Sequence, residues 1–243
     1  MSNLTELNHQ YDSLLKKRDK VAEQLKSIND SLNEIKETID RLVKEKEKGR
    51  FLGVISTPSD FDKITKKINV GDTILILDNK YNKNWVCVDI CKYGNYFMPL
   101  DPLMCSYIDP DNNCNDFYKS EMYKKILPEI LSFIAPILGN HLQIIHCRDN
   151  KNDPNTCHQV KITLPDVKQI AKDYSDDKSC FEYFRRLYKE DNKFYTEFSK
   201  GTWTWTRTVA SGSSFCAAYS YGIVPYNLAA NGWQAVRPLL LIK

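Results

Sequence analysis

The sequence has few of the features that mark enzymes and membrane proteins. It includes only four His and nine Gly, and it contains no P-loop, dinucleotide-binding glycine pattern, nucleophile elbow or His-Glu metalloprotease motif. No run approaches the roughly 20 apolar residues needed to cross a bilayer. The formal net charge is only +3, without the concentrated basic surface that nucleic acid or an anionic membrane requires. We therefore expect no enzymatic activity, no cofactor, and neither a nucleic-acid nor a membrane partner.

The start of the chain also lacks a secretion signal. Residues 1–10 have neither the cationic start nor the apolar run of a signal peptide, so we expect the chain to fold in a cytoplasm. In that compartment the eight cysteines are expected to be free thiols, which are small and often buried. Disulfides are the less favoured interpretation.

A regular repeat occupies the segment between Leu4 and Leu42. Large residues recur there at alternating steps of three and four, without a Pro or Gly, which is typical of a left-handed coiled coil. Arg18 is the one polar member. We interpret it as a side chain that reaches outward to solvent, the alternative being a register lock or an ion site at the axis. The apolar members predict an oligomerisation seam made of Leu4, Leu7, Tyr11, Leu14, Val21, Leu25, Ile28, Leu32, Ile35, Ile39 and Leu42.

The number of strands in this coiled coil is predicted from the residue types along its seam. In the second half, Leu occupies the a positions and Ile the d positions. β-Branched residues at d favour three or four strands over a parallel dimer, so we predict a parallel homotrimer over residues 1–48, with a tetramer left open. The alternative is a helix folded back on its own head, which the lack of an internal turn signal disfavours. The basic tail that ends in Gly49 indicates a helix stop, and residues 49–69 a hinge and linker.

Residues 70–243 have the mixed pattern of a globular head. Short apolar runs bounded by turn residues predict strands, and apolar residues three and four apart predict helices. The strands and helices do not alternate as βαβ units would require, which favours an α+β domain. We expect strands at residues 72–77, 85–90, 95–100 and 142–146, and helices at 120–138, 165–172 and 181–188.

Three segments near the C-terminus carry a resemblance to a known family. They are Trp203-Thr204-Trp205-Thr206-Arg207, then residues 214–222 (SFCAAYSYG) and residues 231–239 (NGWQAVRPL). Together they resemble a domain of unknown function that is widespread in phages and gut bacteria and ends in a W-x-W-(L/T)-R … G … G-V-R-P pattern. The sequence departs from this pattern at Gln234-Ala235, where a single Gly is more usual.

This resemblance covers residues 70–243 and implies both a fold and a setting. The family is similar to the C-type-lectin-like fold and is common in phage structural proteins, often behind a coiled coil. The fold class that we expect is therefore α+β, with an N-terminal parallel, trimeric coiled coil followed by a C-type-lectin-like head. Upstream segments that fit the order of the family's elements lie at residues 70–72, 85–86, 118–122 and 164–165.

The C-terminal region contains a structural set and a binding set of residues. We interpret Trp203, Trp205 and Trp233 as core residues, with sugar stacking on the surface as the alternative. Arg207 and Arg237 are expected to hold the terminal strands by charge-assisted hydrogen bonds to buried carbonyls. Small polar loops that carry Tyr are typical of adaptable binding faces. They predict a ligand-binding set of Tyr219, Tyr221, Tyr226, Asn227 and Asn231.

Two segments resemble metal sites, but neither has the required spacing. His146-Cys147 and Cys157-His158 form a mirrored pair, whereas zinc ligands within a pair are usually two to five residues apart. Residues 109–116 resemble the start of a calcium loop but have Cys114 where Gly is required and Ser120 where the acid belongs. We therefore expect thiols and imidazoles of no common function, a turn-rich surface loop, and no metal.

These features together predict a virion protein of a phage, a tail-fibre or head-fibre protein assembled in the host cytoplasm. Its N-terminal end is expected to attach to other virion proteins. Three heads would then bind a host-surface glycan or protein with the avidity of linked weak sites. The alternative is a structural decoration or connector whose head docks on other virion proteins. A cell-wall hydrolase, which needs a carboxylate pair whose geometry no sequence displays, is a distant third.

Overall fold

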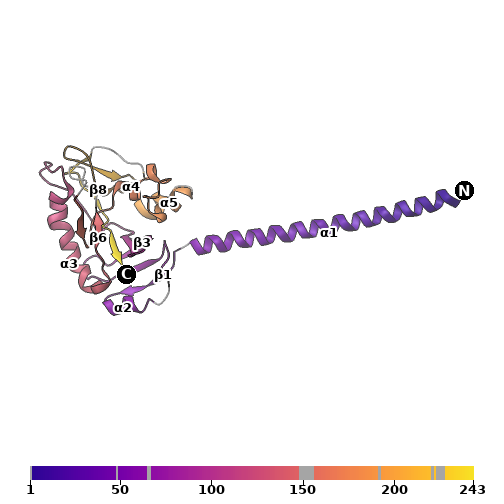
Figure 1. Cartoon of the computed structure of the whole chain (residues 1–243), viewed down its shortest axis with the longest axis horizontal. Helices are drawn as coiled ribbons and strands as arrows, with labels where there is room; N and C mark the ends of the chain where they lie inside the picture. The colour runs from indigo at the N-terminus through magenta and orange to yellow at the C-terminus, as the bar shows by residue number, and fades with distance from the viewer. Residues whose placement is uncertain are drawn as a thin grey trace. The chain divides into compact units, whose positions relative to one another are not determined.

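The computed structural model describes residues 2–47, 49–64, 67–147, 156–190, 193–219, 222 and 228–243. The chain divides into two compact units, Met1–Lys48 and Gly49–Lys243, and each is considered by itself (Figure 1). Within the described residues, no helix is both long and apolar enough to span a membrane.

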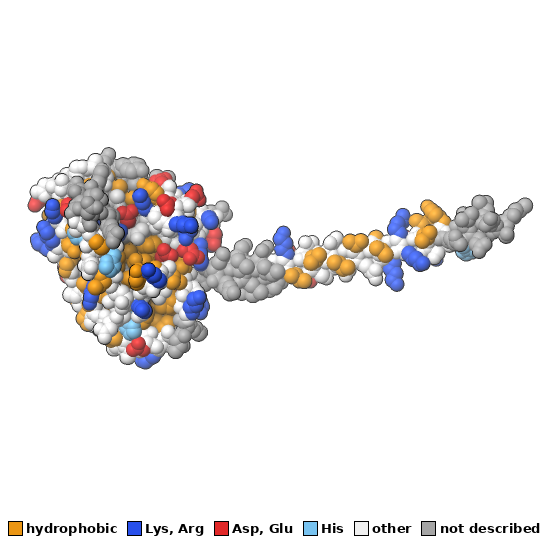
Figure 2. Space-filling model, viewed as in Figure 1, with side chains coloured by type: hydrophobic (Ala, Val, Ile, Leu, Met, Phe, Trp, Pro, Cys, Tyr) orange, Lys and Arg blue, Asp and Glu red, His pale blue; other side chains and the backbone are white. Residues whose placement is uncertain are grey.

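The first unit is a single helix, α1 (Ser2–Glu47). Apolar residues that recur every three or four positions lie on one side of a helix. The described side chains of this set are 53–63% exposed, and Figure 2 shows them on the helix surface. They are Tyr11, Leu14, Val21, Leu25, Ile28, Leu32 and Ile35. The side chains of Leu4, Leu7, Ile39 and Leu42 lie outside the described part of the chain.

The predicted fold class, a parallel trimeric coiled coil followed by a C-type-lectin-like head, is wrong. The structure has one helix whose apolar side chains face solvent, then a mixed, sheet-rich globular unit, and nothing in the described residues indicates a coiled coil or a trimer. The repeat specifies a helix with an apolar face, but it does not specify that another helix covers that face. Likewise, short C-terminal motifs do not determine the order of strands in a sheet. Arg18 lies on the exposed helix surface, with Nη2 2.7 Å from Oδ1 of Asp19.

The second unit begins with a five-stranded sheet in the order β1-β2-β3-β4-β12. The β1–β2 pair is parallel, and the other pairs are antiparallel. Alternating buried and half-buried residues in β2 are typical of a strand with one face on the core. The strands are β1 (Phe51–Ile55), β2 (Thr73–Ile76), β3 (Lys83–Cys91), β4 (Gly94–Pro99) and β12 (Leu240–Ile242).

Residues 49–69, predicted as a hinge and linker, instead contribute to the globular unit. They contain β1 and the short helix α2 (Pro58–Asp62). Ile55 and Phe61 are buried in the core. The sequence pattern does not reveal β1, because this strand is stabilised by a parallel partner strand beyond α2, and such a non-local pairing leaves little local signal.

A second five-stranded sheet has the order β10-β9-β8-β11-β5. Its β8–β11 pair is parallel, and the other pairs are antiparallel. A separate hairpin joins β6 (Ile145–Cys147) to β7 (His158–Val160). The strands of the second sheet are β5 (Met104–Ser106), β8 (Thr204–Ser211), β9 (Ser214–Ala218), β10 (Leu228–Ala229) and β11 (Gln234–Val236).

Helices surround the two sheets, with α3 along one side of the globular unit in Figure 1. α3 (Leu127–Leu138) continues a π-helical turn, Met122–Ile126, and buries Ile130 and Ile134. α4 (Val167–Ile170) starts at Asp166, whose carboxylate accepts a hydrogen bond from the Lys168 N–H, as expected for an N-cap. The remaining helical segments are 3₁₀ turns at Phe117–Lys119, Gly139–His141 and Lys172–Tyr174, α5 (Glu182–Lys189) and a π-helical turn at Phe194–Ser199.

One hydrophobic core joins both sheets and α3. Large side chains that are fully buried dominate it, and burial of such side chains is the main favourable contribution to folding. The core includes Trp85 and Phe97 from the first sheet, Trp205 and Phe215 from the second, and Ile134 from α3.

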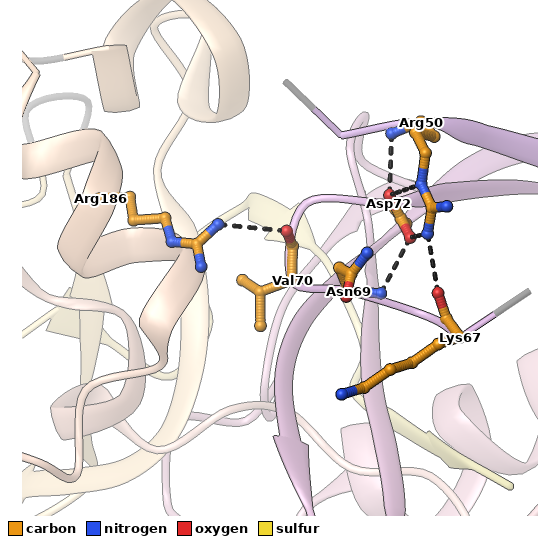
Figure 3. Close-up of polar contacts among 6 residues, drawn as sticks. All are labelled: Arg50, Lys67, Asn69, Val70, Asp72 and Arg186. Carbon is orange, nitrogen blue, oxygen red and sulfur yellow. Dashed lines mark hydrogen bonds and ion pairs between the residues drawn. The ribbon is translucent and has the colours of Figure 1, made fainter. Parts of the chain in front are cut away.

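A buried carboxylate fixes the start of the globular unit (Figure 3). Asp72 is 2% exposed, and its two oxygens accept hydrogen bonds from the backbone N–H, Nε and Nη2 of Arg50 and from the backbone N–H of Asn69. Arg50 Nη2 also donates to the Lys67 carbonyl at 2.7 Å. Burial alone would raise the pKa of Asp72, but the hydrogen bonds from Arg50 and Asn69 outweigh it and hold that pKa below its ordinary value. The cluster ties the chain just before β1 to the start of β2.

Candidate functional site

Aromatic side chains lie at the ends of four neighbouring strands in the second sheet. Tyr219 directly follows β9, Trp203 directly precedes β8, Trp233 directly precedes β11, and Tyr107 directly follows β5. The strands β9, β8, β11 and β5 are adjacent in that order, and β8 and β11 run parallel to each other and antiparallel to their outer neighbours. The four aromatic residues therefore lie at the same end of the sheet. We call them the aromatic row.

The residues of the aromatic row contact each other in two pairs. The ring centroids of Trp203 and Tyr219 are 4.8 Å apart at an angle of 77°. Those of Tyr107 and Trp233 are 6.0 Å apart at 60°. Both distances are typical of favourable edge-to-face pairs. A hydrogen bond of 2.9 Å from the Ala235 N–H to the Trp203 carbonyl joins the two strands that carry the tryptophans.

The row is open to solvent at Trp233, next to its centre, and at Tyr219, at its β9 end. Trp233 is 64% exposed and Tyr219 is 36% exposed, while Trp203 and Tyr107 are half-buried. Asn231 is exposed and Gln234 is half-buried, so polar groups flank Trp233 along the chain. A large aromatic surface of this kind, with hydrogen-bonding groups beside it, is suited to binding.

Two buried side chains, Arg237 and Trp205, form hydrogen bonds to chain segments next to the aromatic row. Arg237 is fully buried, and its Nη2 donates to the Phe198 carbonyl at 3.0 Å while its guanidinium lies 4.7 Å from the Phe198 ring centroid. Its Nη1 donates to the hydroxyl of Thr202 at 3.2 Å, so it holds the segment that leads into Trp203. Burial lowers the pKa of Arg237 to about 10. Trp205 is also fully buried, and its Nε1 donates to the Ser106 carbonyl next to Tyr107.

The structural residues predicted from the sequence have mixed positions. Trp205 lies in the core, whereas Trp203 is half-buried and Trp233 is exposed. Trp233 therefore fits the alternative interpretation, an aromatic residue on the surface. Arg207 Nη1 donates to the Leu164 carbonyl at 2.6 Å, and this contact, like that of Arg237 with the Phe198 carbonyl, is to a buried backbone group.

Of the predicted ligand-binding residues, the structure describes two. Tyr219 lies in the aromatic row, and Asn231 is exposed two positions before Trp233. Tyr221, Tyr226 and Asn227 lie outside the described residues. Sequence reasoning missed Tyr107, because β5 has three residues and its sheet partner β11 is far away in the chain. No local pattern marks such a strand.

The possible metal sites have no complete ligand set among the described residues, since no group of three or more His, Cys, Asp or Glu is placed to hold an ion. In the segment 109–116, the polar side chains bond to backbone groups instead. Asp116 Oδ1 accepts from the Tyr118 N–H at 3.0 Å, and Asn112 Oδ1 accepts from the Ala230 N–H at 2.8 Å. These are the contacts of a structural turn.

Asp89 is the half-buried carboxyl group whose environment most resembles that of a catalytic acid. Burial, together with the neighbouring carboxylate of Glu182, raises the pKa of Asp89, and such a shift can mark a functional site. However, Asp89 Oδ1 accepts from the Ile90 N–H at 3.0 Å, and Glu182 is ion-paired with Arg186 in α5. This arrangement connects β3 to α5, and we assign it a structural role.

A scan against protein-family models, a search of curated proteins and a search of solved structures each find no match to this chain. The resemblance of residues 203–239 to a phage and gut-bacterial domain therefore stays a prediction.

Proposed function

We propose that the chain is a virion appendage protein of a phage and that its globular unit binds a glycan or protein on the host cell surface. The observation that carries this proposal is the aromatic row, in which Trp233 is 64% exposed beside Tyr107 and next to the Trp203–Tyr219 pair. The phage setting is supported by the sequence resemblance alone.

The chemistry of the row favours binding through ring faces and edges. Exposed indole and phenol rings supply a large contact area with little loss of conformational freedom, and aromatic residues are enriched among those that dominate binding energy. Trp233 and Tyr219 offer such surfaces, and the exposed Asn231 offers an amide for hydrogen bonds. The site is therefore suited to a ligand with both apolar faces and polar edges, as sugars and protein surfaces have.

Binding to cells tests this proposal. The full chain, labelled with a fluorophore, is applied to a panel of gut-bacterial strains and to a glycan array. On any target that binds, Trp233→Ala is expected to weaken binding by at least tenfold, because a central aromatic residue typically contributes more than about 1.4 kcal/mol to binding. Tyr93→Ala is the matched control, since Tyr93 is 61% exposed in the turn between β3 and β4 of the other sheet.

Treatment of the cells then identifies the class of ligand. Periodate oxidation destroys sugar diols, and protease treatment removes surface proteins, so loss of binding after one treatment alone assigns the ligand. If cells and glycans do not bind but purified virion proteins do, and Trp233→Ala abolishes that contact, the globular unit is a connector inside the particle. Equal binding by Trp233→Ala and the parent chain would contradict the role of the row.

A further inference from the structure

The hairpin formed by β6 and β7 carries two thiols and two imidazoles. The strands pair so that Cys147 lies opposite His158 and His146 lies opposite Gln159. Successive side chains on a strand point to opposite faces, so the hairpin separates these groups into two sets. Cys147 is buried, whereas His146 is exposed.

On the exposed face, Cys157 contacts His146. Cys157 directly precedes β7, and its Sγ lies 3.6 Å from Nδ1 of His146. This distance is within hydrogen-bond range for sulfur. Cys157 is half-buried, so solvent and small reagents can reach the pair. A thiol and an imidazole in this arrangement are the two groups that form a thiolate–imidazolium ion pair, in which the thiol proton moves to the ring nitrogen.

Of the other seven cysteines, five are buried, Cys105 is exposed, and Cys91 is half-buried like Cys157. The thiols of Cys87, Cys114, Cys147, Cys180 and Cys216 are buried. Burial raises the pKa of Cys180 to about 12 and likewise raises that of Cys114, which keeps both thiols protonated. Cys105 is the more exposed competitor, since it lies on β5 with its side chain exposed. Exposure alone therefore favours reaction at Cys105, whereas activation by an imidazole favours Cys157.

We propose that Cys157, paired with His146, is the reactive thiol of this chain and a site of covalent modification by disulfides. In the step, Nδ1 of His146 takes the thiol proton, and the Cys157 thiolate attacks one sulfur of the incoming disulfide. A bond forms between Cys157 Sγ and that sulfur, the original S–S bond breaks, and its second sulfur leaves as a thiolate, which takes a proton from the imidazolium or from water. The product is a mixed disulfide between Cys157 and the incoming sulfur. The incoming disulfide is the only oxidant that the step requires. This site does not depend on the proposed binding function.

The expected increase in the rate of reaction with a disulfide follows from the fraction of the thiol that is ionised. At pH 7 a thiol with the ordinary pKa of about 8.5 is only about 3% thiolate. Complete ionisation of such a thiol would therefore raise its rate by up to about thirtyfold, and the lower nucleophilicity of a more stable thiolate reduces this gain to roughly threefold. Replacing His146 with Gln keeps a polar side chain on the exposed face and removes the group that accepts the proton.

The experiment treats the full chain with a limiting amount of 5,5′-dithiobis(2-nitrobenzoate) at pH 7 and follows the release of the coloured thiolate. The labelled cysteine is then identified by peptide mass spectrometry. Cys157 is expected to be labelled before Cys105 and before the half-buried Cys91, and Cys157→Ser is expected to remove the fast phase. His146→Gln is expected to slow labelling of Cys157 roughly threefold while leaving the rate at Cys105 unchanged, so Cys105 serves as the internal control.

Two further measurements keep this test independent of folding. In concentrated urea the parent chain and His146→Gln should label Cys157 at the same rate, because the pair exists only in the folded state. Tryptophan fluorescence confirms that the variant is folded before labelling. Labelling of Cys105 before Cys157, or a Cys157 rate that His146→Gln changes by less than twofold, would overturn the proposal.

Discussion

The Asp72 cluster allows a quantitative prediction about the start of the globular unit. Asp72→Asn keeps the shape of the side chain but replaces one carboxylate oxygen with an NH₂ group. The two oxygens of Asp72 now accept four hydrogen bonds, three from Arg50 and one from the Asn69 N–H. In the variant, the NH₂ group faces donors, so at least one set of these hydrogen bonds is lost in a site where the side chain is 2% exposed.

The expected cost combines two effects. A hydrogen bond to a charged group contributes about 1.5–3 kcal/mol, and a buried donor left without a partner costs about 1–3 kcal/mol. The ion pair itself adds little, because the Arg50 side chain is 43% exposed and water screens it. We therefore expect Asp72→Asn to lower the free energy of unfolding by about 3 kcal/mol. For a unit of this size that corresponds to a decrease in Tm of roughly 6–12 °C.

Tryptophan fluorescence is the appropriate assay, because Trp85, Trp203, Trp205 and Trp233 all lie in the globular unit and none in α1. Thermal and urea unfolding are measured for the parent, for Asp72→Asn and for the matched control Asp111→Asn, which changes an exposed carboxylate. The control is expected to lie within about 0.5 kcal/mol of the parent. If Asp72→Asn unfolds within about 1 °C of the parent, the cluster does not stabilise the fold and the reasoning fails.

Two other predictions follow from the same structure. The pKa of Asp72 is held below its ordinary value in the folded state, so its carboxylate contributes stability that is present above the unfolded pKa of about 3.9 and is lost as pH falls through the lower folded value. In urea unfolding below about pH 4, the free energy of unfolding should therefore decrease less on acidification for Asp72→Asn than for the parent. Equal slopes of this free energy against pH for the two proteins would refute the lowered pKa. Trp205→Ala removes a fully buried side chain and should lower the free energy of unfolding by about 3–5 kcal/mol. Trp233→Ala should change it by no more than about 0.5 kcal/mol. A large decrease for Trp233→Ala would show that this residue belongs to the core.

Local patterns in the sequence predicted many of the elements. The strands expected at residues 72–77, 85–90 and 95–100 correspond to β2, β3 and β4, and the helix at 120–138 to the π turn and α3. These segments carry their own apolar periodicity, and Pro136 lies in the last turn of α3. The strand at 142–146 was expected a few residues too early, since β6 is Ile145–Cys147.

What sequence could not supply was the set of long-range pairings. The apolar repeat of α1 predicts a helix correctly, but the coiled coil that the same repeat predicts is wrong, since the described apolar side chains face solvent. The sequence predicts a linker in place of β1, because the partner strand of β1 lies beyond α2. Trp233 is predicted as a core residue because tryptophan is usually well buried, but it lies just before a three-residue strand at the end of the sheet and is exposed.

Only part of the candidate site is predictable from the sequence, because the pairing of distant strands brings its residues together. Tyr219 and Asn231 were predicted as ligand-binding residues from loop composition, and both lie at or beside the aromatic row. Tyr107 joins the row only because β5 pairs with β11. A site built from strand ends that are distant in sequence depends on sheet topology, and one sequence does not display that topology.

The most direct test of the central proposal is the ratio of apparent Kd values for Trp233→Ala and Tyr93→Ala on a cell or glycan target that binds the parent chain. Both variants lose one exposed aromatic side chain from the same globular unit, so the comparison isolates the position. We predict that Trp233→Ala binds at least tenfold more weakly than the parent while Tyr93→Ala binds within about twofold of it. Equal affinities for the two variants, or no binding of the parent to any strain or glycan of the panel, would contradict the proposal.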